Sequence, residues 1–293
     1  MVILLLSESG AAFAHIGSVV YPFFELPTSE LPSLHDGTLD DWDAVLPHAS
    51  LTHTSFTQPG SSDPVDVSSL AWRAFLAWHS SSQFIFVAFE RIDDLYIPAQ
   101  EDLFQRERIE FSVDADHSGG RFAFLDQAEF TREEQARLWN ASAQTYMLKP
   151  EPFTEQGLQV NIDGGARPWV TQNQWTEVGG FHDGGEPNHS VIEARLTPWD
   201  DLNWQGADVS LRSSLRPNAT IGFQILVYDN DIPGGRGGHV YSLHFGETFQ
   251  QSHADFFVDG QLIPCSTADC SQASGTAVEG SSWARIKSSL VPD

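Results

Sequence analysis

Hydrophobic residues occur along this chain in short runs separated by glycine, proline, asparagine and aspartate. In residues 71–78, tryptophan, alanine and leucine recur at every second position, which places them on one face of a β-strand. A serine turn at residues 80–82 follows, and residues 84–89 are almost continuously apolar, as in a strand buried on both faces. The two runs predict a β-hairpin.

Similar patterns predict further strands, and together they indicate the fold class. These strands are expected at residues 108–115, 191–196, 221–228, 241–245 and 256–263. Residues 149–188 are rich in glycine, proline, asparagine and tryptophan and give only weak strand signals. Many short strands without β-α alternation predict an all-β protein, an antiparallel β-sandwich of jelly-roll or immunoglobulin-like type.

One short helical insertion is predicted in the middle of the chain. Thr131 and Glu134 have the spacing of a capping box, in which each side chain bonds the other's backbone N–H. The helix is therefore expected to begin after Thr131 and to end at about Ala141.

The chain is predicted to form one domain between two extensions. Residues 35–263 contain the expected strands, residues 1–34 form an extended leader, and residues 264–293 form a polar C-terminal tail. The leader begins with the apolar run Met1–Leu6, and Ala-Phe-Ala at residues 12–14 resembles a signal-peptide cleavage site. No Lys or Arg precedes the run, so we interpret it as a truncated signal peptide, with a buried first strand as the alternative. The first interpretation predicts a secreted or cell-surface protein.

The two cysteines, Cys265 and Cys270, lie in this polar C-terminal region. Structural zinc sites usually need four ligands, and this spacing is not Cys-x-x-Cys. A local disulfide, or two unimportant thiols, is therefore favoured over a metal site.

Composition excludes some classes of protein. The chain has 293 residues and a formal net charge of −25, which repels nucleic acid and anionic lipid. No stretch approaches the ~20 apolar residues of a membrane-spanning helix. No Gly-x-Ser-x-Gly, phosphate-loop or His-Glu-x-x-His motif is present. We therefore expect neither a nucleic-acid partner nor a membrane span.

An ordered set of short motifs adds a family resemblance. In order they are Asp36-Gly37 with Asp41-Trp42, the hairpin ending in Asp93-Asp94, the acidic strand 108–114, residues 191–194 with Thr197-Pro198-Trp199, and the strand 221–231 with its terminal Asp pair. This order resembles carbohydrate-binding module family 9, whose members are often attached to xylanases, and covers roughly residues 35–263. The resemblance implies a β-sandwich, structural calcium, a sugar held between two tryptophans, and a role in carbohydrate catabolism.

Four tryptophans are the predicted sugar-binding residues. Trp169, Trp175, Trp199 and Trp204 lie in polar, glycine- or proline-rich contexts where an aromatic ring can protrude. The C–H groups of a pyranose pack on such a ring, and nearby polar side chains bond the hydroxyls. The alternative is that each tryptophan caps the edge of the sandwich, because tryptophan is mostly buried. Trp42, Trp72 and Trp78 are assigned to the core.

Two acidic loops are the predicted metal sites. Asp114 and Asp116 precede a glycine pair, and Asp229 and Asp231 precede a Pro-Gly-Gly turn. Calcium takes oxygen ligands of this kind from tight loops, and the family resemblance implies structural calcium, so calcium is the expected cofactor. The alternative is ordinary Asx-turn chemistry, in which the carboxylate accepts from its own loop backbone.

The main functional hypothesis is a secreted, non-catalytic protein that binds a polysaccharide or oligosaccharide. One alternative is an extracellular structural or adhesion protein on the same fold without sugar affinity. Another is a glycoside-active enzyme, for which Glu110 and Glu193 are the carboxylates to inspect, although each could simply face solvent.

Overall fold

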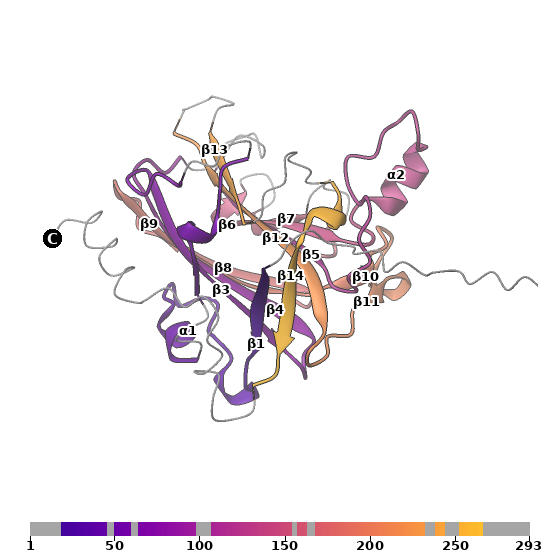
Figure 1. Ribbon diagram of the computed structural model, residues 1–293, viewed down its shortest axis with the longest axis horizontal. Helices are drawn as coiled ribbons and strands as arrows, with labels where there is room; N and C mark the ends of the chain where they lie inside the picture. Colours follow the sequence, from indigo (N-terminus) through magenta and orange to yellow (C-terminus); the bar gives the residue numbers. More distant parts are fainter. Residues whose placement is uncertain are drawn as a thin grey trace, which may run out of the picture.

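A computed structural model describes residues 19–45, 50–59, 64–97, 107–153, 157–162, 168–231, 238–243 and 252–265 (Figure 1). The strands are β1 (Val20–Glu25), β2 (Ser50–Thr52), β3 (Leu70–His79), β4 (Phe84–Asp93), β5 (Ile109–Asp114), β6 (Gln144–Phe153), β7 (Leu158–Ile162), β8 (Thr176–His182), β9 (Asn188–Leu196), β10 (Trp199–Asp201), β11 (Leu211–Arg212), β12 (Thr220–Asp229), β13 (His239–Ser242) and β14 (Val258–Ile263). The α-helices are α1 (Asp40–Val45) and α2 (Arg132–Leu138).

Most of these strands belong to one sheet. Its order is β7-β6-β5-β12-β14-β1-β3-β4-β9-β8, with β13 beside β12 and β2 beside β3, while β10 and β11 form a separate pair. The sheet curls, so that β8 at one end contacts β6 and β7 at the other. The all-β class is confirmed, and the finer jelly-roll or immunoglobulin-like arrangement stays a prediction.

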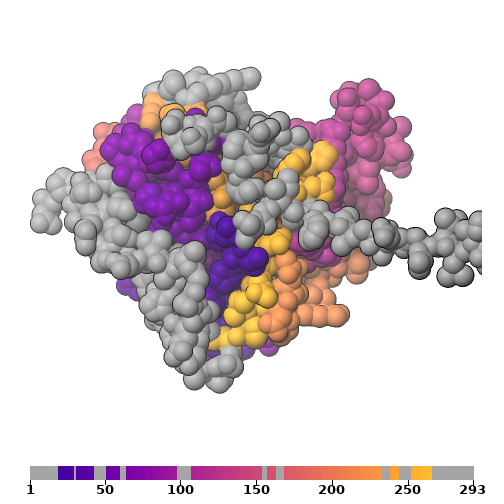
Figure 2. Space-filling view, viewed as in Figure 1, coloured from indigo at the N-terminus to yellow at the C-terminus, as the bar shows by residue number. Residues whose placement is uncertain are grey.

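Strand β1 corrects two expectations. It pairs in parallel with β14 and with β3, so the sheet is mixed and the prediction of antiparallel pairing is wrong at this strand. Figure 2 shows the N-terminal and C-terminal strands side by side. Residues 20–25 also fall in the expected leader, so the sheet begins earlier than residue 35. The expected signal peptide lies outside the described residues.

The β3–β4 hairpin forms as the alternation predicts. Every second residue of β3 from Trp72 to Trp78 enters the main core inside the curled sheet. Strand β4 is buried along its whole length, with one face in that core and the other against Trp42 of α1. Trp42, Trp72 and Trp78 are fully buried, which confirms their assignment to the core.

Helix α2 confirms the predicted insertion. Thr131 caps it, and the reciprocal bonds with Glu134 complete the capping box. The helix ends at Leu138, slightly earlier than expected, and none of its residues is buried. It projects from the body of the protein (Figure 1). None of the helices in the described part of the chain has the length and apolar character that a bilayer crossing requires.

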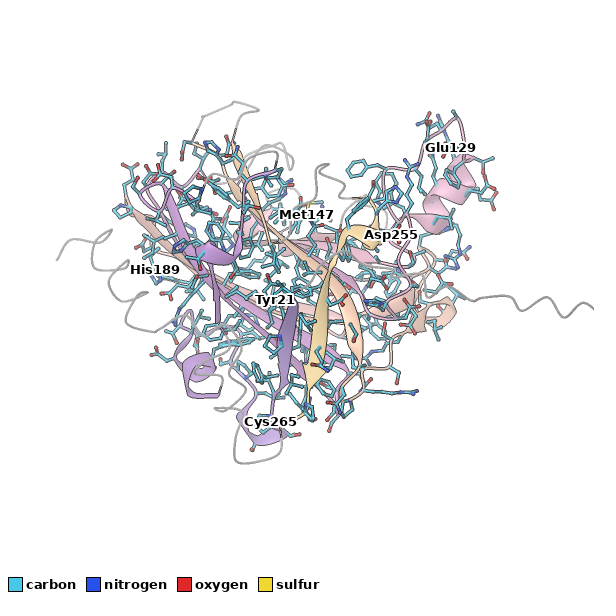
Figure 3. All side chains as sticks on the ribbon, in the orientation of Figure 1. Tyr21, Glu129, Met147, His189, Asp255 and Cys265 are labelled. Carbon is cyan, nitrogen blue, oxygen red and sulfur yellow. The ribbon has the colours of Figure 1, made fainter. Side chains whose placement is uncertain are left out.

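The C-terminal cysteine chemistry agrees with the disulfide interpretation. Cys265, labelled in Figure 3, is disulfide-bonded. The chain's other cysteine, Cys270, and the rest of the expected tail lie outside the described residues.

Candidate functional site

Strand β5 has one apolar face and one polar face. Ile109, Phe111 and Val113 enter the main core. Strand alternation turns the intervening residues the other way, onto a surface shared with the neighbouring strands β6 and β12. We name this surface the polar sheet face; its polar members are Arg108, Glu110, Ser112, Thr145, Lys149, Gln224 and Tyr228. Met147, labelled in Figure 3, lies on it opposite Glu110.

Three residues form the charged centre of the polar sheet face. The Arg108 Nε donates to Glu110 Oε1 at 2.7 Å, and the Tyr228 hydroxyl donates to Glu110 Oε2 at 3.2 Å. The Arg108 guanidinium also lies 3.6 Å from the centroid of the Tyr228 ring, a cation–π contact. Arg108 and Glu110 are only 4% and 6% exposed, whereas Tyr228 is partly exposed.

A second ion pair extends this face along β6. Lys149 Nζ lies 2.5 Å from Glu151 Oε1, and the Tyr96 hydroxyl donates to the other oxygen of the same carboxylate. Lys149 is fully buried. At the opposite end of the face, Ser112 Oγ and Thr145 Oγ1 share a hydrogen bond of 2.8 Å. The face therefore offers charged and neutral hydrogen-bonding groups in a row.

Five carboxylates gather beside the polar sheet face, where β4 and β12 end. We name them the acidic cluster: Asp93, Asp94, Glu107, Asp229 and Asp231. Oxygens of Asp93, Glu107 and Asp229 all lie within 4.8 Å of one another, as do those of Asp93, Asp94 and Asp231. Asp93, Glu107 and Asp229 are buried.

One guanidinium faces this cluster. Arg91 Nη2 donates to Asp93 Oδ2 at 2.8 Å and to Glu107 Oε2 at 2.5 Å. Burial alone would lower the pKa of Arg91, but the two carboxylates raise it above its ordinary value, so the side chain stays charged. One guanidinium therefore faces a group of five carboxyl side chains.

Burial and mutual repulsion raise the carboxylate pKa values in the acidic cluster. The pKa of Asp229 rises to about 7, through burial first and then through Asp93 and Asp231. Burial also raises the pKa of Glu107 to about 8, although Arg91 opposes the shift. These shifts mean that the protein groups around Glu107 and Asp229 stabilise the ionised carboxylates less well than water does.

The donor set of the acidic cluster fits a hard cation. Oδ1 of Asp229 and Oδ1 of Asp231 are buried without a hydrogen-bond partner among the described residues. The Ser69 hydroxyl lies 3.3 Å from Asp94, 3.3 Å from Asp229 and 3.2 Å from Asp231, yet its single hydrogen serves one of them at a time. Calcium prefers such carboxylate oxygens, so the residues present fit the expected cofactor.

The other predicted metal loop has a different environment. Asp114 and Asp229 lie at opposite ends of the antiparallel pair β5 and β12. The Asp114 carboxylate accepts from the N–H of Ser118 at 3.2 Å and of Gly119 at 2.7 Å, and Asp116 also accepts from Ser118. Among the described residues, neither Asp114 nor Asp116 joins a cluster of three ligands. The bond of Asp116, two residues on, is that of an Asx turn, whereas Asp114 accepts from N–H groups four and five residues on. Metal binding there stays a prediction.

The four predicted sugar-binding tryptophans gather at one edge of the core. Trp169, Trp175 and Trp199 pack edge to face, with ring centroids 5.2–6.2 Å apart. Trp199 is 1% exposed, because the other two rings cover it. Its ring therefore does not protrude into solvent as the sequence context led us to expect. Trp204 is 40% exposed, and its backbone oxygen accepts from Trp169 Nε1 at 3.3 Å. Sugar binding by this group stays a prediction.

Glu110 and Glu193 do not come together as a pair. Glu110 bonds Arg108 and Tyr228, whereas Glu193 accepts from Trp42 Nε1 on the far side of β4. Both carboxylates are buried, so the idea that they simply face solvent is wrong.

Sequence reasoning missed most of the polar sheet face and three of the five residues of the acidic cluster. Arg108 begins the alternating strand 108–115 and Tyr228 ends the apolar strand 221–228, and a polar residue at a strand end is the signal that could have marked them. Lys149 begins the section with weak strand signals, so no pattern marked it. Asp93 and Glu107 are remote from Asp229 in sequence. Glu107 precedes β5, which pairs with β12, whereas Asp93 ends β4, which pairs with neither of these strands and meets them through the curl of the sheet.

Comparison with solved structures identifies the class of fold. No protein-family model and no curated protein sequence matches the chain. A family 9 carbohydrate-binding module from Caldicellulosiruptor kristjanssonii in complex with cellotriose superposes with a TM-score of 0.55 and 13% identity, covering 89% of this chain and 100% of that one. A module of the same family and organism, in complex with glucose, gives a TM-score of 0.53 and 13% identity over 85% and 98% of the two chains. The resemblance to carbohydrate-binding module family 9 is thus confirmed at the level of the fold.

Proposed function

We propose that this protein binds a neutral oligosaccharide or polysaccharide on the polar sheet face, without catalysing a reaction. The observation that carries the proposal is the buried group Arg108–Glu110–Tyr228, on a fold shared with modules solved in complex with cellotriose and glucose. Buried charges weaken a fold unless they are paired, and they often mark a binding site. Here the charges are paired and lie beside a partly exposed aromatic ring.

The chemistry of these side chains suits sugar hydroxyls. A carboxylate accepts two hydrogen bonds and a guanidinium donates several in one plane, so each can hold a pair of adjacent hydroxyl groups. Tyr228 adds a hydroxyl and an aromatic face. The net charge of −25 disfavours polyanionic glycans, which is why we propose a neutral one.

We propose calcium as the occupant of the acidic cluster. Asp93, Glu107 and Asp229 would hold it, with Asp94 and Asp231 at its border. A bound cation would neutralise carboxylates that Arg91 alone leaves in excess, and it would stabilise only the folded chain.

An extracellular location is part of the proposal. The disulfide at Cys265 supports it, because disulfides persist mainly in oxidising compartments. The apolar N-terminal run is consistent with export.

Tryptophan stacking provides a second position for a sugar. Trp204 is the most exposed of the four predicted tryptophans and contacts Trp169. Variants at the two surfaces would separate the two positions.

The test is a glycan array in calcium-containing buffer with the full-length chain and three variants. Glu110→Gln removes the charge at the centre of the polar sheet face, Trp204→Ala removes the exposed ring, and Glu133→Gln on the exposed surface of α2 is the control. We expect selective binding by the wild type, the control and Trp204→Ala, and loss of binding by folded Glu110→Gln. Loss in Trp204→Ala alone would move the site to the tryptophan edge. A blank array for the wild type would reject sugar binding and favour a structural or adhesion protein.

A further inference from the structure

The acidic cluster and the polar sheet face share a boundary on two strands. Glu107 of the cluster directly precedes Arg108 of the face, and Asp229 of the cluster directly follows Tyr228 of the face. The backbones of the two face residues are joined, because the N–H of Tyr228 donates to the Arg108 oxygen at 3.1 Å. Each of these two carboxylate residues is therefore one peptide unit away from a residue of the face.

Arg91 links the two sites from a third strand, β4. The Nη2 that donates to Asp93 and Glu107 also lies 3.3 Å from the Tyr228 backbone oxygen. On the other side of the boundary, the N–H of Asn230 donates to Glu107 Oε1 at 2.7 Å. Arg91 and Asn230 thus contact the carboxylates of the cluster and lie beside Tyr228. For this reason the positions of Arg108 and Tyr228 depend on the geometry of the cluster.

The charges determine which way this link acts. Oxygens of Asp93, Glu107 and Asp229 crowd within 4.8 Å of one another in a buried setting, and Oδ1 of Asp229 has no hydrogen-bond partner among the described residues. A cation bound there would draw these oxygens onto itself, including those of Glu107 and Asp229, the two residues that precede and follow the sugar-facing pair. It would thereby hold the strand ends in the geometry in which Arg108, Tyr228 and Glu110 are bonded to one another.

We propose that cation occupancy of the acidic cluster controls sugar affinity at the polar sheet face, with Arg91 as the positioning residue between them. This inference rests on the proposed function. Because coupling between two binding sites is reciprocal, sugar must also strengthen cation binding by the same factor.

The first experiment needs no sugar. Hydrogen–deuterium exchange of the full chain is followed by mass spectrometry in excess calcium and in chelator. We expect calcium to slow exchange in residues 108–114 and 224–228 as well as at the cluster. Slowing confined to the cluster residues would overturn the proposal.

The second experiment measures affinity for cellotriose by calorimetry, with and without calcium. We expect about tenfold tighter binding with calcium, and calcium binding strengthened about tenfold by cellotriose. Asp229→Asn should bind cellotriose with the weak affinity of the chelated protein at every calcium concentration. Asp259→Asn, which removes a carboxylate of β14 that pairs with His117, is the matched control and should behave as the wild type.

A substitution at Arg91 tests the link itself. Arg91→Lys keeps the positive charge but replaces the planar guanidinium with an ammonium on a side chain one atom shorter, so it does not reproduce the contacts of Nη2 with Asp93, Glu107 and the Tyr228 oxygen. We expect it to bind calcium yet to lose the calcium dependence of cellotriose affinity. If this variant fails to fold, the comparison of the wild type with Asp229→Asn decides the question.

Two results would contradict the proposal in different ways. Equal cellotriose affinity with and without calcium would overturn the coupling and leave sugar binding intact. No binding to cellotriose or to any array glycan at saturating calcium would overturn both the coupling and the proposed function.

Discussion

Glu193 makes the stability of this protein depend on pH in a direction that can be calculated. It is 1% exposed, and the Trp42 ring donates from Nε1 to Glu193 Oε1 at 2.7 Å. Burial raises the pKa of Glu193 to about 8; the Trp42 bond opposes the shift, and the neighbouring Asp41 and Asp36 add to it. The folded protein therefore holds this proton over a pH range in which the unfolded chain has released it.

The sign of the effect follows from linkage. A carboxyl whose folded pKa lies above its unfolded value stabilises the fold fully below the unfolded pKa, and loses that contribution as pH rises through the folded pKa. For Glu193 the window runs from the ordinary value of 4.5 to about 8. At about 1.4 kcal/mol per pKa unit, the full contribution is on the order of 3–5 kcal/mol.

The perturbation is Glu193→Gln, which keeps the volume and the acceptor for Trp42 but removes the titration. Urea unfolding monitored by tryptophan fluorescence at pH 5, 7 and 9 gives the free energy of unfolding. We expect the variant to match the wild type within about 1 kcal/mol at pH 5 and to exceed it by a few kcal/mol at pH 9. Glu133→Gln on the exposed surface of α2 is the control and should show no pH-dependent difference. A difference between Glu193→Gln and wild type that stays constant from pH 5 to 9 would refute the reasoning.

Three further predictions concern the metal, the sugar and the core. Chelation should lower the melting temperature of the wild type and leave that of Asp229→Asn unchanged. The expected loss in the free energy of unfolding is up to about 2.7 kcal/mol, for calcium at a hundredfold excess over its Kd. If scanning fluorimetry shows no shift in the wild-type melting temperature, calcium is not a ligand of the folded protein. Tyr228→Phe loses the hydroxyl that bonds Glu110, and calorimetry should show about fivefold weaker sugar binding, or about 1 kcal/mol; unchanged affinity would exclude that contact. Trp199→Ala should cost about 3–5 kcal/mol in urea unfolding, because its ring is buried between two others; a loss below about 1 kcal/mol would contradict its core role.

The sequence predicts well those strands that have one apolar and one polar face, or two apolar faces. The hairpin β3–β4 is such a case, because its alternate residues enter separate clusters. Strand β1 escaped prediction because Pro22 lies within it, and proline is rare inside a sheet. The structure accommodates Pro22 because β1 pairs with β3 only at Phe24 and Glu25, so the β3 side is open beside the proline.

The strands of the long middle section were hidden for a different reason. Strand β6 contains Pro150 next to the buried Lys149, and its pairing with β7 shifts between Leu148 and Phe153. Strand β8 contains Gly179, which reads as a turn residue. A Cβ at this position would lie 1.3 Å from the backbone oxygen of Leu34, so glycine is required by a close approach of two chain segments. Such an approach depends on the tertiary structure, and the local sequence pattern does not predict it.

The same distinction separates the two candidate sugar positions. Tryptophan is the residue that sequence reasoning associates with sugar stacking, yet three of the four predicted rings cover one another, because large apolar rings gain most free energy by leaving water. Charged residues behave in the opposite way: burying Arg108 and Glu110 costs free energy, and the bonds of the two residues to each other and to Tyr228 offset part of that cost. A charged group that remains buried at such a cost is the stronger indication of a binding surface. For this reason the loss of binding in Glu110→Gln, with binding retained in Trp204→Ala, is the result that would place the sugar on the polar sheet face.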